Sequence, residues 1–477
     1  MTLHLAPGRG HLADMPDITR RHTLCAAAAT LAAAPLARAA AQATPSVAAA
    51  PPAAEAPLFG ARIWTLPNGL TVALVESRRA PVVAQYLYYA AGGAEDPAGR
   101  SGVAHFLEHM MFKGSPNVPS GTLSRRVARE GGNDNAFTSR DVTAYYQQVE
   151  ASRLPMIMAM EADRLAAALI PADELESERR VVLEERNQRT DSNPRARFQE
   201  AFRAALWGPQ AWPGRPIIGW ADEIRAISRD NLTDFHGHFY APANATLVIA
   251  GAVSEAEARA LVDEHYGPVP AREVRRRDRA PAPATAHEPR LTVREPQARE
   301  ALMLRAWMAP SLTTARAEQS LPLEVLAHLL GSGQGSRLHA ALVETGLAVQ
   351  AGASYDSEAA GVTEFMVYGV PRRGVTPERL EEAANAVIAT LLQDGPTEAE
   401  VARAIRQMSS GSLLALDSFG AAPRMLGGVL AIGLSADVVE YWPARLRAVT
   451  QAQVAEAARA VLGAAPNTTA WLLPEGA

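Results

Sequence analysis

Cysteine is nearly absent from this chain, because its 477 residues contain only Cys25. A single cysteine can form no intramolecular disulfide and cannot build a thiolate-rich metal site. A basic excess is also missing, since the formal net charge is −5, and this argues against a nucleic-acid-binding surface. Beyond residue 45 the sequence has no run of eighteen apolar residues, so we expect no membrane span there.

The first 43 residues have the composition of an export signal. Arg20 and Arg21 precede an apolar, alanine-rich run over Cys25–Leu36, and small residues suited to cleavage follow. The arginine pair resembles a twin-arginine signal, which exports folded proteins. We expect residues 1–43 to be removed and residues 44–57 to form a flexible leader rich in Pro and Ala. The mature protein would then be periplasmic and free of cysteine.

Roughly 420 residues remain, a length that suits two or three domains. The sequence also repeats a helix–turn–strand unit. One copy begins at Ile224 and passes through Pro242, and the other begins at Leu446 and passes through Pro466. The offsets are 222 (446 minus 224) and 224 (466 minus 242), and a near-constant offset indicates duplicated halves.

Residues 268–290 separate the two halves. They combine a basic run, Arg272–Arg279, with the Pro/Ala run Pro281–Ala286, which is a linker composition. We interpret the basic run as a solvated tether and not as a binding surface. Each half mixes expected strands, such as Val82–Ala90, with expected helices, such as Pro377–Leu392, so an α+β fold is predicted.

The chemistry is concentrated in Gly102–Phe112, whose sequence is GVAHFLEHMMF. If this segment is helical, His105 and His109 lie one turn apart and project from the same face. Two imidazoles at that spacing can bind one Zn²⁺, and Glu108 beside them can hold a water and accept its proton. The order His-x-x-Glu-His inverts the commoner zinc-peptidase motif. The alternative is an amphipathic helix with histidines on its polar face.

A catalytic zinc site needs a third protein ligand from another part of the chain. The charged segment Asp173–Arg189 is expected to be helical, and it offers Glu178 and Glu185 along one face. Glu184 would point roughly 100° away from Glu185 on such a helix. Most glutamates on a charged helix only form solvated salt bridges, so this segment alone does not identify the ligand.

Three segments together resemble the inverzincin metallopeptidases, the family of pitrilysin and insulin-degrading enzyme. The shorter branch that contains the mitochondrial processing peptidase fits best. The resemblance implies two homologous α/β roll domains, each a mixed sheet covered by helices, that face each other around a cleft. The zinc-binding peptidase domain would span residues 58–267 and its homologue residues 291–477. The segments are GVAHFLEHMMFKGS from Gly102, GGNDNAFTSRDVTAYY from Gly131 and ESERRVVLEER from Glu176.

The resemblance also implies the residues of the site. It makes His105 and His109 zinc ligands, with Glu108 as the general base. Glu185, which lies 76 residues after His109, becomes the third ligand of a single Zn²⁺ per chain. Glu178 would orient one of the zinc-binding histidines.

The resemblance further implies where a peptide substrate binds. It places Asn135, Ala136 and Phe137 on a strand at the cleft edge, which would pair with an extended substrate backbone. For Phe137, packing in the core is an equally good explanation.

The second half departs from the family pattern. Active members usually carry an arginine and a tyrosine there that bind the substrate carbonyl, but Val343 and Val349 occupy the matching positions. Arg337 and Tyr355 lie nearby with the wrong spacing. We therefore expect the zinc-bearing subunit of a heterodimeric endopeptidase, completed by a homologous partner that supplies the Arg/Tyr pair. The alternatives are a non-catalytic scaffold subunit and a dedicated peptidase that matures a cofactor peptide.

Overall fold

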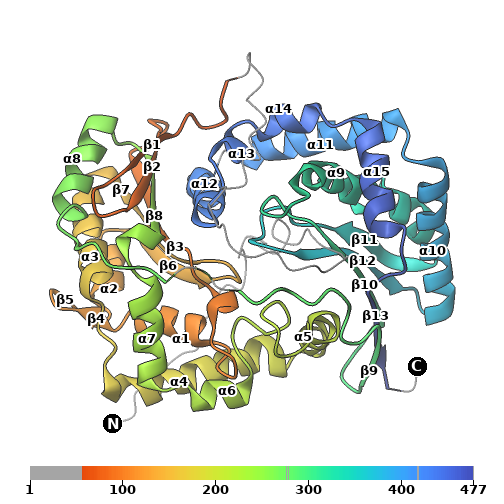
Figure 1. Ribbon diagram of the computed structural model, residues 1–477, viewed down its shortest axis with the longest axis horizontal. Coiled ribbons are helices and arrows are strands. Elements are labelled where there is room, and N and C mark those ends of the chain that lie inside the picture. Colours follow the sequence, from red (N-terminus) through yellow and green to blue (C-terminus); the bar gives the residue numbers. More distant parts are fainter. Residues whose placement is uncertain (1–55, 276, 278, 416–417, 476–477) are drawn as a thin grey trace, which may run out of the picture.

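The computed structural model describes residues 56–475, apart from residues 276, 278, 416 and 417. The predicted signal, Cys25 and most of the leader lie outside the described residues. Figure 1 shows two halves side by side, each built on one twisted sheet with helices packed on it. In the described part of the chain, no helix has the length and apolar character needed to cross a membrane.

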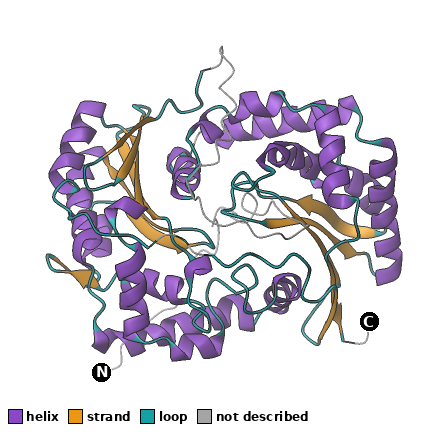
Figure 2. Cartoon of the chain, in the orientation of Figure 1, coloured by secondary structure: helices purple, strands orange, loops and turns teal. Residues whose placement is uncertain are grey.

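The first half of the described chain is built on a six-stranded sheet with the order β1-β2-β8-β3-β7-β6. Figure 2 shows the strands of both halves in orange and the helices that pack on them in purple. Strands β2 and β8 are parallel, and all other neighbours are antiparallel. Every residue of β8 is buried, as expected for an apolar strand in a sheet covered on both faces. The bounds are β1 (Arg62–Thr65), β2 (Thr71–Glu76), β3 (Val82–Tyr89), β6 (Asn133–Thr138), β7 (Thr143–Glu150) and β8 (Ala245–Gly251).

The second half repeats this design in a five-stranded sheet, within the described residues. Its order β9-β13-β10-β12-β11 matches β2-β8-β3-β7-β6, and β9 and β13 are its one parallel pair. The prediction of an α+β fold with two homologous halves is thereby confirmed. The bounds are β9 (Arg290–Glu295), β10 (Leu302–Ala309), β11 (Ala348–Ser354), β12 (Thr363–Pro371) and β13 (Thr468–Pro474), and a separate hairpin joins β4 (Gly114–Ser115) to β5 (Val118–Pro119).

The repeated unit found in the sequence forms equivalent elements. Helices α7 and α15 both begin at a capping box, made by Ser228 with Asn231 and by Thr450 with Gln453, and lead to β8 and β13. In the first half, α7 belongs to a group of helices that bury apolar side chains in one core. They are α1 (Val103–Met110), α2 (Thr122–Arg129), α3 (Leu154–Ala167), α4 (Ala172–Arg186), α6 (Ala221–Ala226), α7 (Arg229–Phe239) and α8 (Glu255–His265).

The helices of the second half build a second core on its sheet. They are α9 (Ser320–Gly331), α10 (Pro377–Asp394), α11 (Glu398–Ala415), α14 (Trp442–Arg447) and α15 (Gln451–Leu462), and the short α13 (Asp437–Glu440) packs beside α12.

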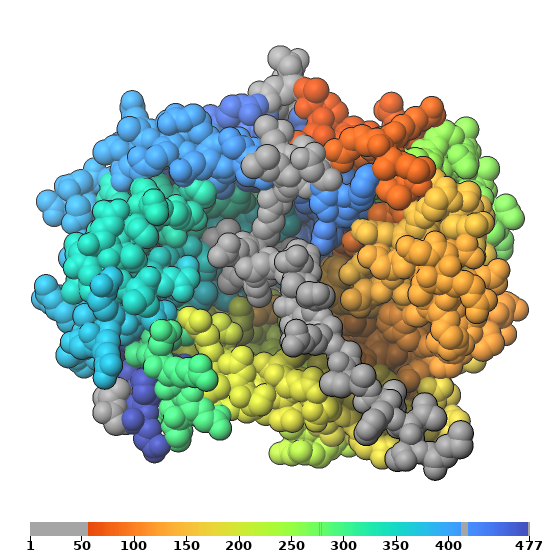
Figure 3. Space-filling model, turned by 180° about the vertical axis from the view of Figure 1, so that it is seen from behind, coloured from red at the N-terminus to blue at the C-terminus, as the bar shows by residue number. Residues whose placement is uncertain are grey.

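Two helices are exchanged between the halves. Helix α5 (Pro194–Trp207) comes from the first half, but Phe198 and Trp207 are buried in the core of the second. Helix α12 (Ala421–Ala431) comes from the second half, and its Leu426 is buried against the face of the first sheet that lies opposite the helices of the first half. Figure 3 shows from behind how the yellow segment around α4 and α5 joins the two lobes at the bottom. Each half therefore stabilises the other.

The basic run of the linker is not solvated at Arg277 and Arg279, so its interpretation as a solvated tether was wrong there. Arg279 has a side chain only 11% exposed and donates to carboxylates of Glu95 and Asp141, both at 2.6 Å. Arg277 donates to the carbonyl oxygens of Ala90 at 2.9 Å and Asp141 at 2.6 Å. In an extended segment alternate residues point the same way, so both side chains turn inward and find acceptors there.

Candidate metal centre

The metal-binding motif lies on α1, and the start of this helix is fixed by a buried carboxylate. Asp96 accepts hydrogen bonds from the backbone N–H groups of Gly102 at 2.7 Å and Ala104 at 2.8 Å. Burial raises the pKa of Asp96 to about 7. Gly102 has a φ of 90°, and a Cβ there would lie 2.5 Å from the carbonyl oxygen of Ile218. Only glycine fits this entry into the helix.

Three side chains from α1 and α4 converge beside α1. Nε2 of His109 lies 3.1 Å from Oε2 of Glu185, and Nε2 of His105 lies 3.5 Å from the same oxygen. Zinc ligands about 2.0–2.1 Å from the ion lie roughly 3.3 Å apart in a tetrahedral site, so this donor set fits zinc. Among the described residues, His105, His109 and Glu185 are the one group of this kind that could hold a metal ion.

The neighbouring Glu184 does not join this group. It is exposed and its carboxylate accepts a hydrogen bond from the amide of Gln188 at 2.8 Å. The helix geometry expected from the sequence thus separates the two adjacent glutamates.

The surroundings shift the pKa values of the three side chains in different directions. Burial lowers the pKa of His105 to about 4, so this imidazole is neutral at physiological pH. Burial opposes ionisation of Glu185, but the hydrogen bond from His109 and the charges around it hold its pKa at about 2. Burial likewise disfavours a charged His109, yet its bonds to Glu178 and Glu185 raise its pKa to about 9. Zinc would therefore have to displace a proton from His109.

Glu178 orients the second histidine of the motif. Its Oε1 lies 2.8 Å from Nδ1 of His109, which leaves Nε2 facing Glu185. Lys113 contacts the other oxygen of Glu178 at 2.5 Å and Glu174 at 3.1 Å. A carboxylate behind a ligating imidazole fixes both the tautomer and the ring orientation.

Glu108 lies beside the three possible ligands but outside their group. It is buried, and its Oε2 accepts a hydrogen bond from Oγ1 of Thr138 at 2.6 Å. Burial raises its pKa, which brings it toward the range suited to a general base. The sequence did not point to Thr138, because the contact depends on how β6 lies against α1.

The strand predicted to bind substrate, β6, is an edge strand of the first sheet. Asn135 is exposed, and its side-chain oxygen accepts from the backbone N–H of Ala136 at 2.8 Å. Ala136 packs against the core beneath α1. Phe137 packs edge-on against Tyr88, with ring centroids 6.1 Å apart, so it contributes to packing. Substrate binding by these three residues stays a prediction.

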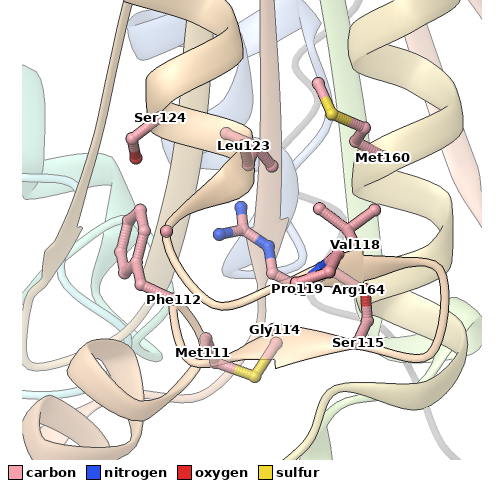
Figure 4. A pocket seen from close by; sticks show the side chains of 11 residues that line it. Met111, Phe112, Gly114, Ser115, Val118, Pro119, Leu123, Ser124, Met160 and Arg164 are labelled. Atoms are coloured by element: carbon pink, nitrogen blue, oxygen red, sulfur yellow. The ribbon is translucent and has the colours of Figure 1, made fainter.

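A small cavity lies between the segment after α1 and α3 (Figure 4). Its volume is about 20 Å³, which is enough for one water and too small for a substrate side chain. Arg164 lines it, stacks on Tyr145 at 4.3 Å and pairs with the buried Glu161. This cavity therefore belongs to the core and is not a substrate pocket.

The second half contributes no arginine or tyrosine at the two family positions. Val343 packs against the second core, and Val349 is 49% exposed on β11 at a bulge. Arg337 is bound to Glu400 at 2.7 Å, and the buried Tyr355 donates to the carbonyl of Pro310 at 3.1 Å. Arg337 and Tyr355 thus both have hydrogen-bond partners within the second half.

Two family profiles match successive parts of this chain. The profile of the insulinase family, peptidase family M16, matches residues 71–214, and the profile of the peptidase M16 inactive domain matches residues 226–408. An uncharacterized zinc protease of Mycobacterium bovis is 32% identical over 381 residues, which cover 79% of this chain and 84% of the relative. The chain belongs to peptidase family M16. Its possible zinc site lies in the half that matches the insulinase profile.

Solved structures share the fold of this M16 chain. A protease from Helicobacter pylori superposes with a TM-score of 0.78 at 22% identity, covering 88% of this chain and 100% of that one. The periplasmic protease PqqL from Escherichia coli gives a TM-score of 0.72 at 21% identity. That match covers 88% of this chain but 48% of PqqL, so this M16 chain spans about half of the longer protease.

Proposed function

We propose that this M16 chain is a zinc-dependent endopeptidase that cleaves peptides or unfolded protein segments. The proposal rests on one observation: the site combines a group of possible metal ligands with a separate buried carboxylate. Three donor atoms lie at zinc-ligand spacing, while the buried Glu108 stands beside them and is held by Thr138. A site that only bound zinc structurally would need no such free carboxylate.

Each residue then has a distinct task in hydrolysis. Zinc bound by His105, His109 and Glu185 would supply Lewis acidity toward the substrate carbonyl and the attacking water. Glu108 takes the proton of that water and passes it to the leaving amine, while Thr138 holds its Oε2 in place. The free edge of β6 offers backbone groups to an extended peptide, which would align the scissile bond.

The chain would act as the catalytic subunit of a heterodimer in the periplasm. The side chains of Val343 and Val349 cannot donate hydrogen bonds, so the substrate carbonyl lacks the two side-chain donors expected from the second half. A homologous partner with an arginine and a tyrosine at these positions would supply them. The match to half of PqqL supports a two-part enzyme, and residues 1–43 support export. A scaffold role would require none of the intact site residues.

The test is peptide hydrolysis by the zinc-loaded chain, with and without a homologous M16 chain that carries the Arg/Tyr pair. Losing one such donor costs about 10²–10³-fold in other enzymes, so the isolated chain should show little turnover and the mixture much more. Mixing the partner with the Glu108→Gln variant controls for activity of the partner itself. Full activity of the isolated chain would refute the heterodimer, and no zinc-dependent cleavage in any mixture would refute the peptidase.

A further inference from the structure

An arginine that is not part of the family motif lies directly behind the third zinc ligand. Arg189 belongs to a π-helical turn, Asn187–Asp191, that follows α4, and π-helical turns are often found at functional sites. Its Nη1 lies 2.6 Å from Oε1 of Glu185, whereas Oε2 of Glu185 faces the two histidines. The positive charge of Arg189 also acts on His105 and Glu108. The positive charge of Arg189 therefore acts on several side chains of the site and not on Glu185 alone.

Most of the Arg189 side chain remains available to a ligand. It is 68% exposed, while Glu185 is only 17% exposed. A guanidinium group has five N–H donors in a planar fork, and the contact with Glu185 occupies one edge of it. Another edge can therefore receive a second carboxylate in a bidentate arrangement without breaking the first contact.

The side chains around the metal position are mostly acidic, so the exposed edge of Arg189 is a place where a substrate carboxylate could bind. Glu108, Glu178 and Glu185 lie around the metal position, so an acidic substrate would meet repulsion there. Lys113 is already held by Glu174 and Glu178. Arg189 is bound to the ligand itself, and successive residues of an extended peptide are only about 3.3 Å apart. A carboxylate close to the scissile bond would therefore come within reach of the guanidinium.

We propose that Arg189 is a specificity residue that binds a substrate carboxylate flanking the scissile bond, so that the peptidase prefers acidic peptides. This inference rests on the proposed peptidase function. The carboxylate can belong to an aspartate or glutamate side chain or to the C-terminus of a short peptide. Both present the same planar anion to the guanidinium.

The experiment compares peptides that differ only in this carboxylate, with the zinc-loaded chain and its partner. One pair is amidated and carries Glu or Gln at the positions flanking the scissile bond, and the other pair has a free or amidated C-terminus. We expect a preference of about tenfold in kcat/KM for the acidic member of at least one pair. Arg189→Gln should abolish that preference, and Arg189→Lys should retain part of it.

A binding measurement separates this inference from the peptidase proposal. Fluorescence anisotropy of labelled peptides on the zinc-loaded Glu108→Gln variant reports affinity without turnover. Arg180→Gln is the matched control, because Arg180 is an exposed arginine of the preceding helix α4 whose charge acts on Glu176. Acidic preference that persists in Arg189→Gln, or is absent from the unaltered chain, would overturn the role of Arg189. If no peptide is cleaved but Arg189-dependent binding of the acidic member is observed, only the peptidase proposal fails.

Discussion

The two halves of this chain share one framework, yet among the described residues a group of side chains suited to a metal ion is found in the first half alone. Helix α1 follows β3, and α9 follows β10, which is the equivalent strand of the second sheet. The two helices align without a gap at an offset of 219 (328 minus 109). At this offset His105 corresponds to Glu324, Glu108 to Ala327 and His109 to His328. The second half has a histidine at the position of His109 and an alanine at the position of Glu108.

The position equivalent to Glu185 also differs between the two halves. Helix α11 packs on α9 as α4 packs on α1, and an offset of 222 (407 minus 185) places Gln407 at the position of Glu185. Nε2 of His328 lies 3.0 Å from Oε1 of Gln407, against 3.1 Å between His109 and Glu185. The distance between the two side chains is nearly the same in both halves, but the second half has a neutral amide in place of the carboxylate. Burial accordingly lowers the pKa of His328, whereas two carboxylates raise that of His109.

The comparison shows that the two halves place equivalent side chains at equivalent positions, while the chemical groups at these positions differ. The second half is still needed structurally, because α12 covers the first sheet and α5 completes the second. Its framework can therefore persist without catalytic residues.

Removing the base should have the largest effect. Glu108→Gln keeps the shape of the side chain but cannot accept a proton, so hydrolysis by the chain with its partner should fall roughly 10²–10⁴-fold. Zinc content should not change, because Glu108 is not among the metal-binding donors. Assays of peptide cleavage and bound zinc on the same sample test both statements. Substantial remaining turnover would show that another group is the base.

The charged pair around His109 predicts how stability depends on pH in the metal-free chain. A folded pKa of about 9, above the ordinary value of 6.5, means that protonation stabilises the folded state. This contribution is complete below pH 6.5 and is lost as the pH rises through 9, an effect of up to about 3 kcal/mol. Chemical denaturation at pH 6 and 9 measures it. In His109→Gln the difference between the two pH values should shrink, and an unchanged difference would contradict this origin.

The exchanged helix α12 should tolerate alanine at one glycine and reject it at the next. A Cβ at Gly427 would lie 2.1 Å from the ring of the buried Tyr88, so Gly427→Ala should destabilise the fold by about 1–3 kcal/mol. Gly428 has no atom within 4 Å of its Cβ position, so Gly428→Ala should stabilise the helix by about 0.5–1 kcal/mol. The free energy of unfolding of both variants decides this. Equal effects would mean that α12 does not pack tightly on the first sheet.

The smallest expected change restores a charge to the second half. Gln407→Glu should raise the pKa of His328, because the new carboxylate stabilises the imidazolium as Glu185 does for His109. The rise should be smaller than for His109, which has two acidic partners. Titration of the His328 ring followed by NMR measures the shift, and an unchanged pKa would argue against the equivalence of the two positions.

Much of the candidate site follows from local sequence. Helical periodicity places His105, Glu108 and His109 together on α1, and it places Glu178 and Glu185 on one face of α4. That α1 and α4 meet was supplied by the family resemblance, because no local pattern determines which helices pack together. The role of Thr138 could not be predicted, since it depends on the position of an edge strand relative to α1.

The fold class was also predictable, but its exchanged helices were not. An amphipathic pattern shows that α5 and α12 bury one face, yet it does not show against which sheet. The inward turn of Arg277 and Arg279 was missed for a related reason, because a basic run is usually solvated unless buried acceptors lie beside it. The remnant of the motif at Ala327 and His328 could have been found by extending the repeat offset to the histidine segment.

Metal analysis of the purified chain tests the central claim, one zinc site confined to the first half, most directly. Elemental analysis should give one zinc per chain for the unaltered protein and for Glu184→Gln, whose side chain faces solvent. Glu185→Gln should lower the zinc content well below one, because it removes a charged ligand. Two zinc ions per chain, or equal zinc content in both glutamine variants, would contradict the account.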